Sequence, residues 1–410
     1  MGGNAFNVLL PNASFPRMPP QVYLGLKAKL TPILQALYSI VAIPHEAPEK
    51  PDHGDLDVVV CGPCDGLVHE DVRRALKSTC SIPLEGNRTS NFAIPVESLQ
   101  LGWHAPSKEA YIQVDVRVCA NAQDWERAVL FSSYGDTGMM LGLLARSMHL
   151  SLGSSGLRLA NPVPTSPPTT FYLSYSFPSI FAFLGLSMDR WEQGFQTQRE
   201  VFDWIASSPY YVAKRLVSSD KDQTGHKKAR DARGMYQNFL EFNRSQNAST
   251  PSSRSVVTGE AAMDMALVYF GRRQLYDALL HTSSVKKHAK AVFTGRSVEE
   301  WTEMKGMPIR LIMEEVRRRL GGTDILPAEC AISIDGEADN SISPALLIMT
   351  VWEKVLFTMS SGEIRTLTTI VKEEMDKEGK LAFDWRKAKR QKEEQKALQR
   401  QNERPAVEND

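Results

Sequence analysis

Two segments rich in β-branched residues, each with aspartate on one face, constrain this chain more than any other feature. Residues 54–60 read Gly-Asp-Leu-Asp-Val-Val-Val, and residues 111–118 read Tyr-Ile-Gln-Val-Asp-Val-Arg-Val. Successive side chains of a strand point to opposite faces. Asp55 and Asp57 therefore share one face of the first strand, and Asp115 lies on the polar face of the second. We expect the three carboxylates to converge on one sheet.

Converging carboxylates favour a metal site. Unpaired carboxylates repel one another, which raises their pKa values and costs stability unless cations neutralise them. A set of oxygen ligands alone favours Mg²⁺ or Mn²⁺ over zinc, and strands ~4.8 Å apart suit a pair of cations ~3.5–4 Å apart. We predict Asp55, Asp57 and Asp115 as metal ligands and catalytic residues. The competing interpretation is that they are ordinary strand-end aspartates that face water.

The N-terminal part of the chain alternates helical and strand patterns. Apolar residues recur at helical spacing over residues 22–40, and a shorter helix is expected at residues 68–76. The two aspartate-bearing strands lie between and after these helices. Residues 1–160 are therefore predicted to form a mixed-sheet domain of an α+β protein.

A proline-rich stretch over residues 160–170 predicts a connector to a second, helical domain over residues 171–360. Within it we expect a long surface loop at 321–343 and a buried helix at 344–359. Residues 372–410 are rich in Lys, Glu, Gln and Arg and poor in large apolar residues, which predicts a charged, partly disordered tail.

Composition narrows the compartment and the partners. The 410 residues include 48 basic and 48 acidic side chains, so bulk charge draws the chain to neither nucleic acid nor an anionic membrane. Five cysteines are an odd number and too few for a disulfide scaffold in a chain this long. The N-terminus lacks a signal-peptide pattern, and no apolar run approaches the ~20 residues that a membrane span needs. We expect an intracellular protein, cytoplasmic or nuclear, with no membrane partner.

Cys61-Gly62-Pro63-Cys64 follows the first strand and is similar to the thioredoxin active site. There, a helix N-terminus stabilises the reactive thiolate. Val60 stands where that family has tryptophan, and neighbouring acids raise a thiol pKa. A thiol oxidoreductase is therefore a third functional hypothesis, and a simple turn after the strand is favoured over it.

Several motifs together resemble the polymerase-β-type nucleotidyltransferase superfamily, and most closely its phage-type nucleotidyltransferases. The resemblance covers most of residues 1–320 and rests on these segments: Gly2-Gly3-Asn4-Ala5-Phe6, Gly54-Asp55-Leu56-Asp57-Val58, the block 131–138 (Phe-Ser-Ser-Tyr-Gly-Asp-Thr-Gly), Gly153-Ser154-Ser155-Gly156-Leu157 and residues 200–216.

The resemblance implies transfer of a nucleoside monophosphate from an NTP to an acceptor hydroxyl. Asp55 and Asp57 would hold both cations and Asp115 the second, while Gly2, Gly3 and Gly54 would contact the nucleotide. Arg146 and Ser147 stand where the family's helix is expected to carry histidine and lysine. This departure keeps open an alternative, a catalytically inactive relative that binds nucleic acid.

Residues 214–319 contain 20 basic and 12 acidic side chains, so this region is locally positive. Residues 294–320 also bear a distant resemblance to the helical body of CCA-adding enzymes. We predict that Arg317, Arg318 and Arg319 bind the acceptor, which we expect to be RNA. The competing interpretation is a solvated helix end.

Overall fold

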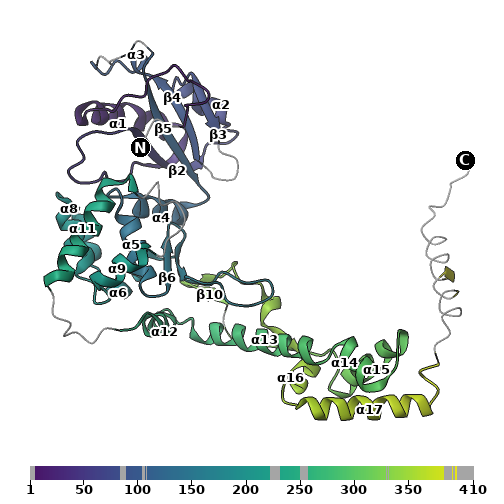
Figure 1. The fold of residues 1–410 in the computed structure, drawn as a ribbon. Coiled ribbons are helices and arrows are strands. Elements are labelled where there is room, and N and C mark those ends of the chain that lie inside the picture. Colours follow the sequence, from purple (N-terminus) through teal and green to yellow (C-terminus); the bar gives the residue numbers. More distant parts are fainter. Residues whose placement is uncertain are drawn as a thin grey trace, which may run out of the picture. The chain divides into compact units, whose positions relative to one another are not determined.

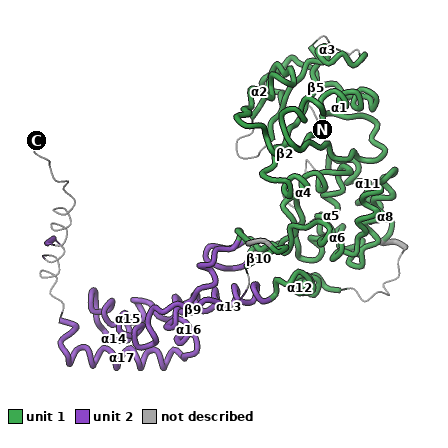
Figure 2. Tube along the Cα trace, turned by 180° about the vertical axis from the view of Figure 1, so that it is seen from behind, with its two compact units in different colours: residues 1–162, 170–273, 332–341 green, residues 163–169, 274–331, 342–410 purple. Residues whose placement is uncertain are grey.

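The computed structural model describes residues 5–83, 89–103, 107, 109–221, 231–249, 257–328, 330, 332–382, 390 and 393–394. The chain forms two compact units (Figure 2). Unit 1 comprises residues 1–162, 170–273 and 332–341, and unit 2 comprises residues 163–169, 274–331 and 342–410. The proline-rich stretch was predicted to connect two domains. It does not separate the two units, because the chain returns to unit 1 at Thr170.

Unit 1 begins with the predicted mixed sheet, in the strand order β1-β2-β5-β4-β3 (Figure 1). β2 and β5 are parallel, and the other neighbouring strands are antiparallel. The α+β class is confirmed. The strands are β1 (Tyr38–Ala42), β2 (Asp55–Pro63), β3 (Cys80–Pro83), β4 (Thr89–Pro95) and β5 (Tyr111–Cys119).

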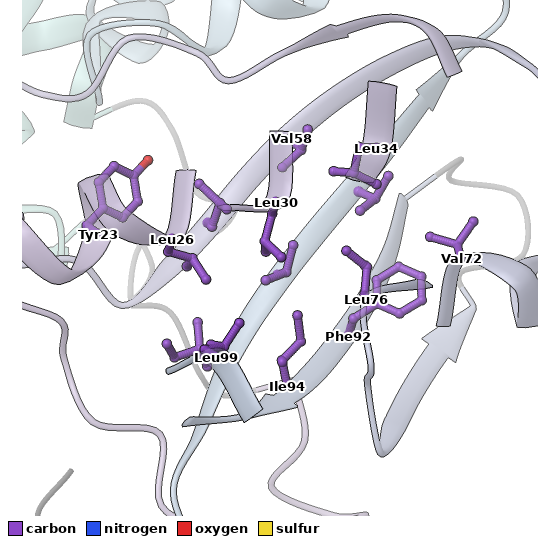
Figure 3. Packing of buried hydrophobic residues seen from close by; sticks show 14 of the residues in the cluster. Tyr23, Leu26, Leu30, Leu34, Val58, Val72, Leu76, Phe92, Ile94 and Leu99 are labelled. Carbon is purple, nitrogen blue, oxygen red and sulfur yellow. The ribbon is translucent and has the colours of Figure 1, made fainter. Parts of the chain in front are cut away.

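One face of this sheet carries the main hydrophobic core (Figure 3). Helix α1 (Pro20–Gln35) contributes Leu26, Leu30 and Leu34, which recur at helical spacing and are buried against strand residues such as Val58. Helices α2 (His69–Ala75) and α3 (Val96–Leu99) complete this layer. The short helix predicted at 68–76 is confirmed as α2.

The helix predicted over residues 22–40 ends at Gln35, and its expected last turn is strand instead. Tyr38 pairs with Pro63 and Ala42 with Val59, so β1 forms the edge of the sheet. The sequence pattern misled because Ile40 and its neighbours suit either structure, and pairing with β2 decides between them.

The rest of unit 1 contains a three-stranded antiparallel sheet together with helices. Its elements after residue 171 are mainly helical, as predicted, whereas the sheet itself was not predicted. Its elements are α4 (Ala122–Ser132), α5 (Thr137–Arg146), β6 (Leu150–Gly153), β7 (Gly156–Leu159), β8 (Tyr172–Ser174), α6 (Phe177–Leu184), α7 (Met188–Gln193), α8 (Gln198–Ala206), α9 (Ala213–Lys221), α11 (Gly234–Ser249), α12 (Gly259–Tyr269), β10 (Ser333–Ile334) and β11 (Glu337–Ala338).

Tyr134 and Gly135, in the block at 131–138, form a junction inside unit 1. Both have positive φ, of 60° and 68°. The backbone N–H of Tyr134 donates to the carbonyl of His45 at 2.6 Å, and its hydroxyl donates to the carbonyl of Trp191 at 3.0 Å. A Cβ at Gly135 would lie 2.5 Å from that of Ala47. The block therefore joins the segment after β1 to α5 and α7.

Unit 2 is mainly helical, with α13 (Arg273–Val292), α14 (Gly295–Thr302), α15 (Met307–Arg319), α16 (Val351–Phe357) and α17 (Ser361–Lys377). Its core joins apolar residues of α14, α15, α16 and α17. Within the part of the chain that the structure describes, no helix combines the length and the apolar character needed to cross a bilayer.

Two expectations about residues 321–359 were wrong. The stretch 321–343 is not simply a loop, since it contains β9 (Ile325–Pro327) and the β10–β11 hairpin. Of residues 344–359, only α16 is α-helical; a 3₁₀ turn at Pro344–Leu347 and β12 (Ile348–Thr350) precede it. β12 pairs with β9, a distant partner that local patterns do not reveal. The predicted tail over residues 372–410 was placed too early, because α17 continues to Lys377 and the core of unit 2 includes Met375 and Leu381. Most of the chain beyond residue 382 lies outside the described residues.

A buried ion pair connects the segment after the β10–β11 hairpin to the rest of unit 1. Arg272 Nη2 donates to Asp339 Oδ2, and the two side chains are 3% and 0% exposed. The Arg272 guanidinium also lies over the ring of Phe171, 5.1 Å from its centroid. The adjacent Arg273 forms an exposed ion pair, with Asp264 at 2.7 Å, and both of these side chains lie in solvent.

Asp339→Asn should lower the free energy of unfolding of unit 1 by about 3–5 kcal/mol, because it leaves the buried Arg272 charge uncompensated. Asp264→Asn is the matched control, and breaking this exposed pair should cost no more than about 1 kcal/mol. Urea unfolding curves of the two variants and the wild type measure both values. Equal losses would contradict the role assigned to the buried pair.

Candidate active site on the sheet

The structure brings the three predicted aspartates to one face of the sheet. Parallel pairing of β2 with β5 places Asp57 directly opposite Asp115, and Asp55 opposite Gln113. Antiparallel pairing of β4 with β5 places Asn91 on the other side of Asp115. The three aspartates thus share one face of the sheet, as side-chain alternation predicted.

This face is divided between an apolar half and a polar half. Helix α4 covers the half toward the carboxyl ends of β2 and β5, where Val59, Cys61 and Cys119 form a small cluster with Ala128. Trp125 Nε1 of α4 donates to the carbonyl of Val59 at 2.9 Å. The aspartates occupy the other half of the face.

Asp115 is held by amide donors. Asn91 Nδ2 donates to Asp115 Oδ1 at 2.6 Å, and Gln113 Nε2 donates to the same oxygen at 2.9 Å. Burial raises the pKa of Asp115 to about 6; the two amides oppose this shift, and the charge of Asp55 adds to it. Asn91 was not predicted as a site residue, because it follows Thr89 and Ser90 in β4 and its sequence neighbours do not distinguish it.

Asp57 has the more strongly perturbed carboxyl. Its side chain is open to solvent, yet the surrounding protein desolvates it, and the charges of Asp55, Asp115 and Glu46 act in the same direction. Together they raise the pKa of Asp57 to about 7, while Lys50 opposes the shift. The carboxylates therefore repel one another and lack a full complement of positive charge.

Glu46 adds a fourth acidic group that sequence reasoning missed. Its Oε2 accepts from Lys50 Nζ at 2.6 Å and lies 3.2 Å from His53 Nδ1, and its Oε1 accepts from the Tyr23 hydroxyl. The ring of Tyr23 stacks on His53 with centroids 3.8 Å apart. His53 is only 5% exposed, and this burial lowers its pKa.

The donor set fits Mg²⁺ or Mn²⁺ in its chemistry, because it offers only carboxylate oxygens with an excess of negative charge. Across the described residues, no three acidic, histidine or cysteine side chains are grouped closely enough to hold a metal ion by themselves. Mg²⁺ in nucleotide enzymes commonly takes one or two carboxylates and completes its coordination with substrate phosphates and water. Asp57 and Asp115, opposite each other, are the residues best placed to supply those two carboxylates.

The predicted nucleotide-binding glycines are only partly described. Gly54 is buried and immediately precedes β2, next to Asp55. Gly2 and Gly3 lie outside the described residues.

The predicted acceptor arginines at the end of α15 have partners within unit 2. Arg317 lies over the ring of Trp352, 5.0 Å from its centroid. Arg318 and Arg319 each bind Glu315, and Arg319 also binds Glu374 at 2.6 Å. The three side chains thus have different local contacts. Only Arg318 has most of its side chain, 71%, in solvent.

The Cys61–Cys64 pair lacks the geometry of a thioredoxin site. Cys61 is buried within β2, whereas Cys64 is exposed after the strand, and α2 begins only at His69. In thioredoxin a helix N-terminus stabilises the thiolate of the first cysteine, and no helix begins at Cys61.

A cavity of about 530 Å³ lies elsewhere in unit 1, between α4, the start of α6, α7 and the β10–β11 turn. His45 and Tyr134 line it, but none of the three aspartates does. The sheet carboxylates and the cavity are therefore separate features of the same unit.

Comparison with models of known protein families gives no match, and comparison with curated proteins gives none either.

Asp57→Asn should change how stability depends on pH in the absence of metal. The carboxyl has a pKa of about 7 in the folded protein and ~3.9 when unfolded, so between these values the folded state binds more protons. The free energy of unfolding then falls as pH rises from about 4 to 7. The variant should lose this contribution and gain stability over the wild type at pH 8.

Urea unfolding in EDTA at a series of pH values measures the effect. Asp65→Asn, in the exposed turn after β2, should retain the wild-type dependence. An Asp57→Asn curve parallel to that of the wild type would show that the Asp57 carboxyl is not perturbed.

Proposed function

We propose that this protein transfers a nucleoside monophosphate from an NTP to an acceptor hydroxyl with release of pyrophosphate. The observation that carries the proposal is the pairing of Asp57 opposite Asp115 in parallel strands, with Asp55 on the same face. The motif resemblance to polymerase-β-type nucleotidyltransferases supports the same chemistry, since that superfamily's Asp-x-Asp strand and later single aspartate resemble the pattern at these positions.

In this proposal Asp55 and Asp57 hold the cations that carry the triphosphate, and Asp115 completes the site on the acceptor side. Bound Mg²⁺ or Mn²⁺ would neutralise phosphate charge and lower the pKa of the acceptor hydroxyl. Asn91 and Gln113 fix the orientation of Asp115 through their amide donors. Lys50, held by Glu46, supplies a positive charge close enough to lower the pKa of Asp57.

Asp57→Asn should reduce metal-dependent nucleotide transfer by more than about a hundredfold, because loss of even an outer-shell partner of a metal site costs 10–100-fold and Asp57 is proposed as a direct ligand. Incorporation of each of the four labelled NTPs into total RNA, or into the protein itself, with Mg²⁺ or Mn²⁺ measures the loss. Asp65→Asn should keep wild-type turnover.

Wild-type turnover by Asp57→Asn would refute the three-carboxylate site. A wild-type protein that transfers no NTP but binds nucleic acid would favour the alternative of an inactive nucleotidyltransferase relative.

An RNA acceptor remains a further part of the proposal, and Arg318 offers the cleanest test of it. Reversing the charges of all three arginines would also break the Trp352 and Glu374 contacts. Arg318→Gln removes one exposed pair with Glu315, at a cost of no more than about 1 kcal/mol.

If Arg318 contacts a phosphate of single-stranded RNA, Arg318→Gln should reduce the slope of log affinity against log salt by ~0.7. Arg310→Gln is the matched control, because Arg310 lies on the same helix, is equally exposed and forms a similar pair with Glu314. Filter-binding titrations at several salt concentrations give the slopes. Identical slopes for both variants and the wild type would place the acceptor site elsewhere.

A further inference from the structure

The cavity between α4 and α7 is walled largely by aromatic rings. Trp125 of α4, Tyr134 before α5, Phe177 of α6 and Trp191 of α7 all line it. The Trp191 ring meets the Tyr134 ring edge-on with centroids 4.9 Å apart, and Tyr134 stacks on His45 at 5.0 Å. These ring contacts hold the wall in place, and flat apolar walls with a few polar groups are typical of sites for small organic ligands.

Negative charge exceeds positive charge around the same cavity. Glu126 of α4 and Glu192 of α7 both line it, and both are exposed. Neither has an ion-pair partner among the residues that the structure describes. Two carboxylates from different helices are therefore available to an occupant.

The third lining carboxylate, Asp335, is bound to the protein. It accepts from the Ser174 hydroxyl and from the backbone N–H groups of Tyr175 and Ser176, at 2.6–3.0 Å. Arg127 carries the permanent positive charge among the described lining residues; it lies over the Tyr175 ring, 5.6 Å from the centroid, and 3.7 Å from Asp124, and its Nε is buried without a hydrogen-bond partner among the described residues.

We infer that this cavity binds a small organic cation, in which an ammonium group lies against the aromatic wall and is neutralised by Glu126 and Glu192. Aromatic faces attract cations, most strongly where water is excluded, and nearby carboxylates add to that attraction. The same excess of negative charge disfavours a phosphate-bearing ligand. The inference goes beyond nucleotide transfer and stands independently of it, because none of the three sheet aspartates lines the cavity.

The cavity shares one segment with the acidic face of the sheet. His45 lines the cavity, and the adjacent Glu46 is one of the charges that raise the pKa of Asp57. A bound cation would therefore lie beside the segment that carries Glu46.

Choline and its neutral carbon isostere 3,3-dimethylbutan-1-ol test the inference, since they differ in charge but hardly in shape. Trp125 and Trp191 provide the signal, and tryptophan fluorescence is titrated at constant ionic strength with EDTA and without NTP. Choline should bind the wild type at least tenfold more tightly than the isostere does. The double variant Glu126→Gln, Glu192→Gln should weaken choline binding at least tenfold and leave binding of the isostere unchanged.

Glu241→Gln is the control, because Glu241 is an exposed glutamate on α11 that does not line the cavity; it should bind choline as the wild type does. Thermal unfolding should confirm that both variants fold. The inference is overturned if choline gives no saturable signal, if choline and its isostere bind equally, or if adenosine binds and choline does not. None of these readouts requires nucleotide transfer, so a failure here and a failure of the proposed function are distinguishable.

Discussion

The parallel pairing of β2 with β5 is the constraint on which both the core and the candidate site of unit 1 depend. Its register places Leu56 beside Val114 on the face packed against α1, and places Asp57 beside Asp115 on the other. A slip of one residue would exchange the two faces of β2, burying aspartates in the core and exposing its apolar residues. Burial of the apolar face therefore fixes the arrangement of the carboxylates, which would otherwise repel one another apart.

Hydrogen-bond donors among the described residues stabilise only one of the three aspartates on the acidic face of the sheet. Asn91 and Gln113 donate hydrogen bonds to Asp115, whereas Asp57 has the unfavourable charges of Asp55, Asp115 and Glu46 around it. By linkage, the raised pKa values of Asp57 and Asp115 correspond to a loss of stability when both carboxyls are ionised. Such concentrated perturbation is common at functional sites, and for this reason we propose the reaction at this face rather than at the cysteine pair or the arginines.

The acidic face of the sheet and the aromatic cavity differ in chemistry, but neighbouring residues of one segment, His45 and Glu46, contribute to both. The junction at Tyr134 links the segment at His45 to α5 and α7, and its ring also forms part of the aromatic cavity. The neighbouring Glu46 acts electrostatically on the sheet carboxylates. The motif at 131–138, which the resemblance singled out, thus has a direct structural explanation, since a tyrosine and a glycine with positive φ allow this tight connection.

The amino-acid sequence by itself determined which residues of β2 and β5 share a face, because side-chain alternation is a local property of the backbone. The spacing of apolar residues along a helix is also a local property, and it revealed α2 and most of α1. Tertiary structure decided what depends on partners far along the chain: β1 instead of a last helical turn, the pairing of β9 with β12, and the approach of Asn91 and Glu46 to the aspartates. It also decided that Arg317 packs on Trp352, because a run of arginines specifies charge but not the neighbours that will bind it.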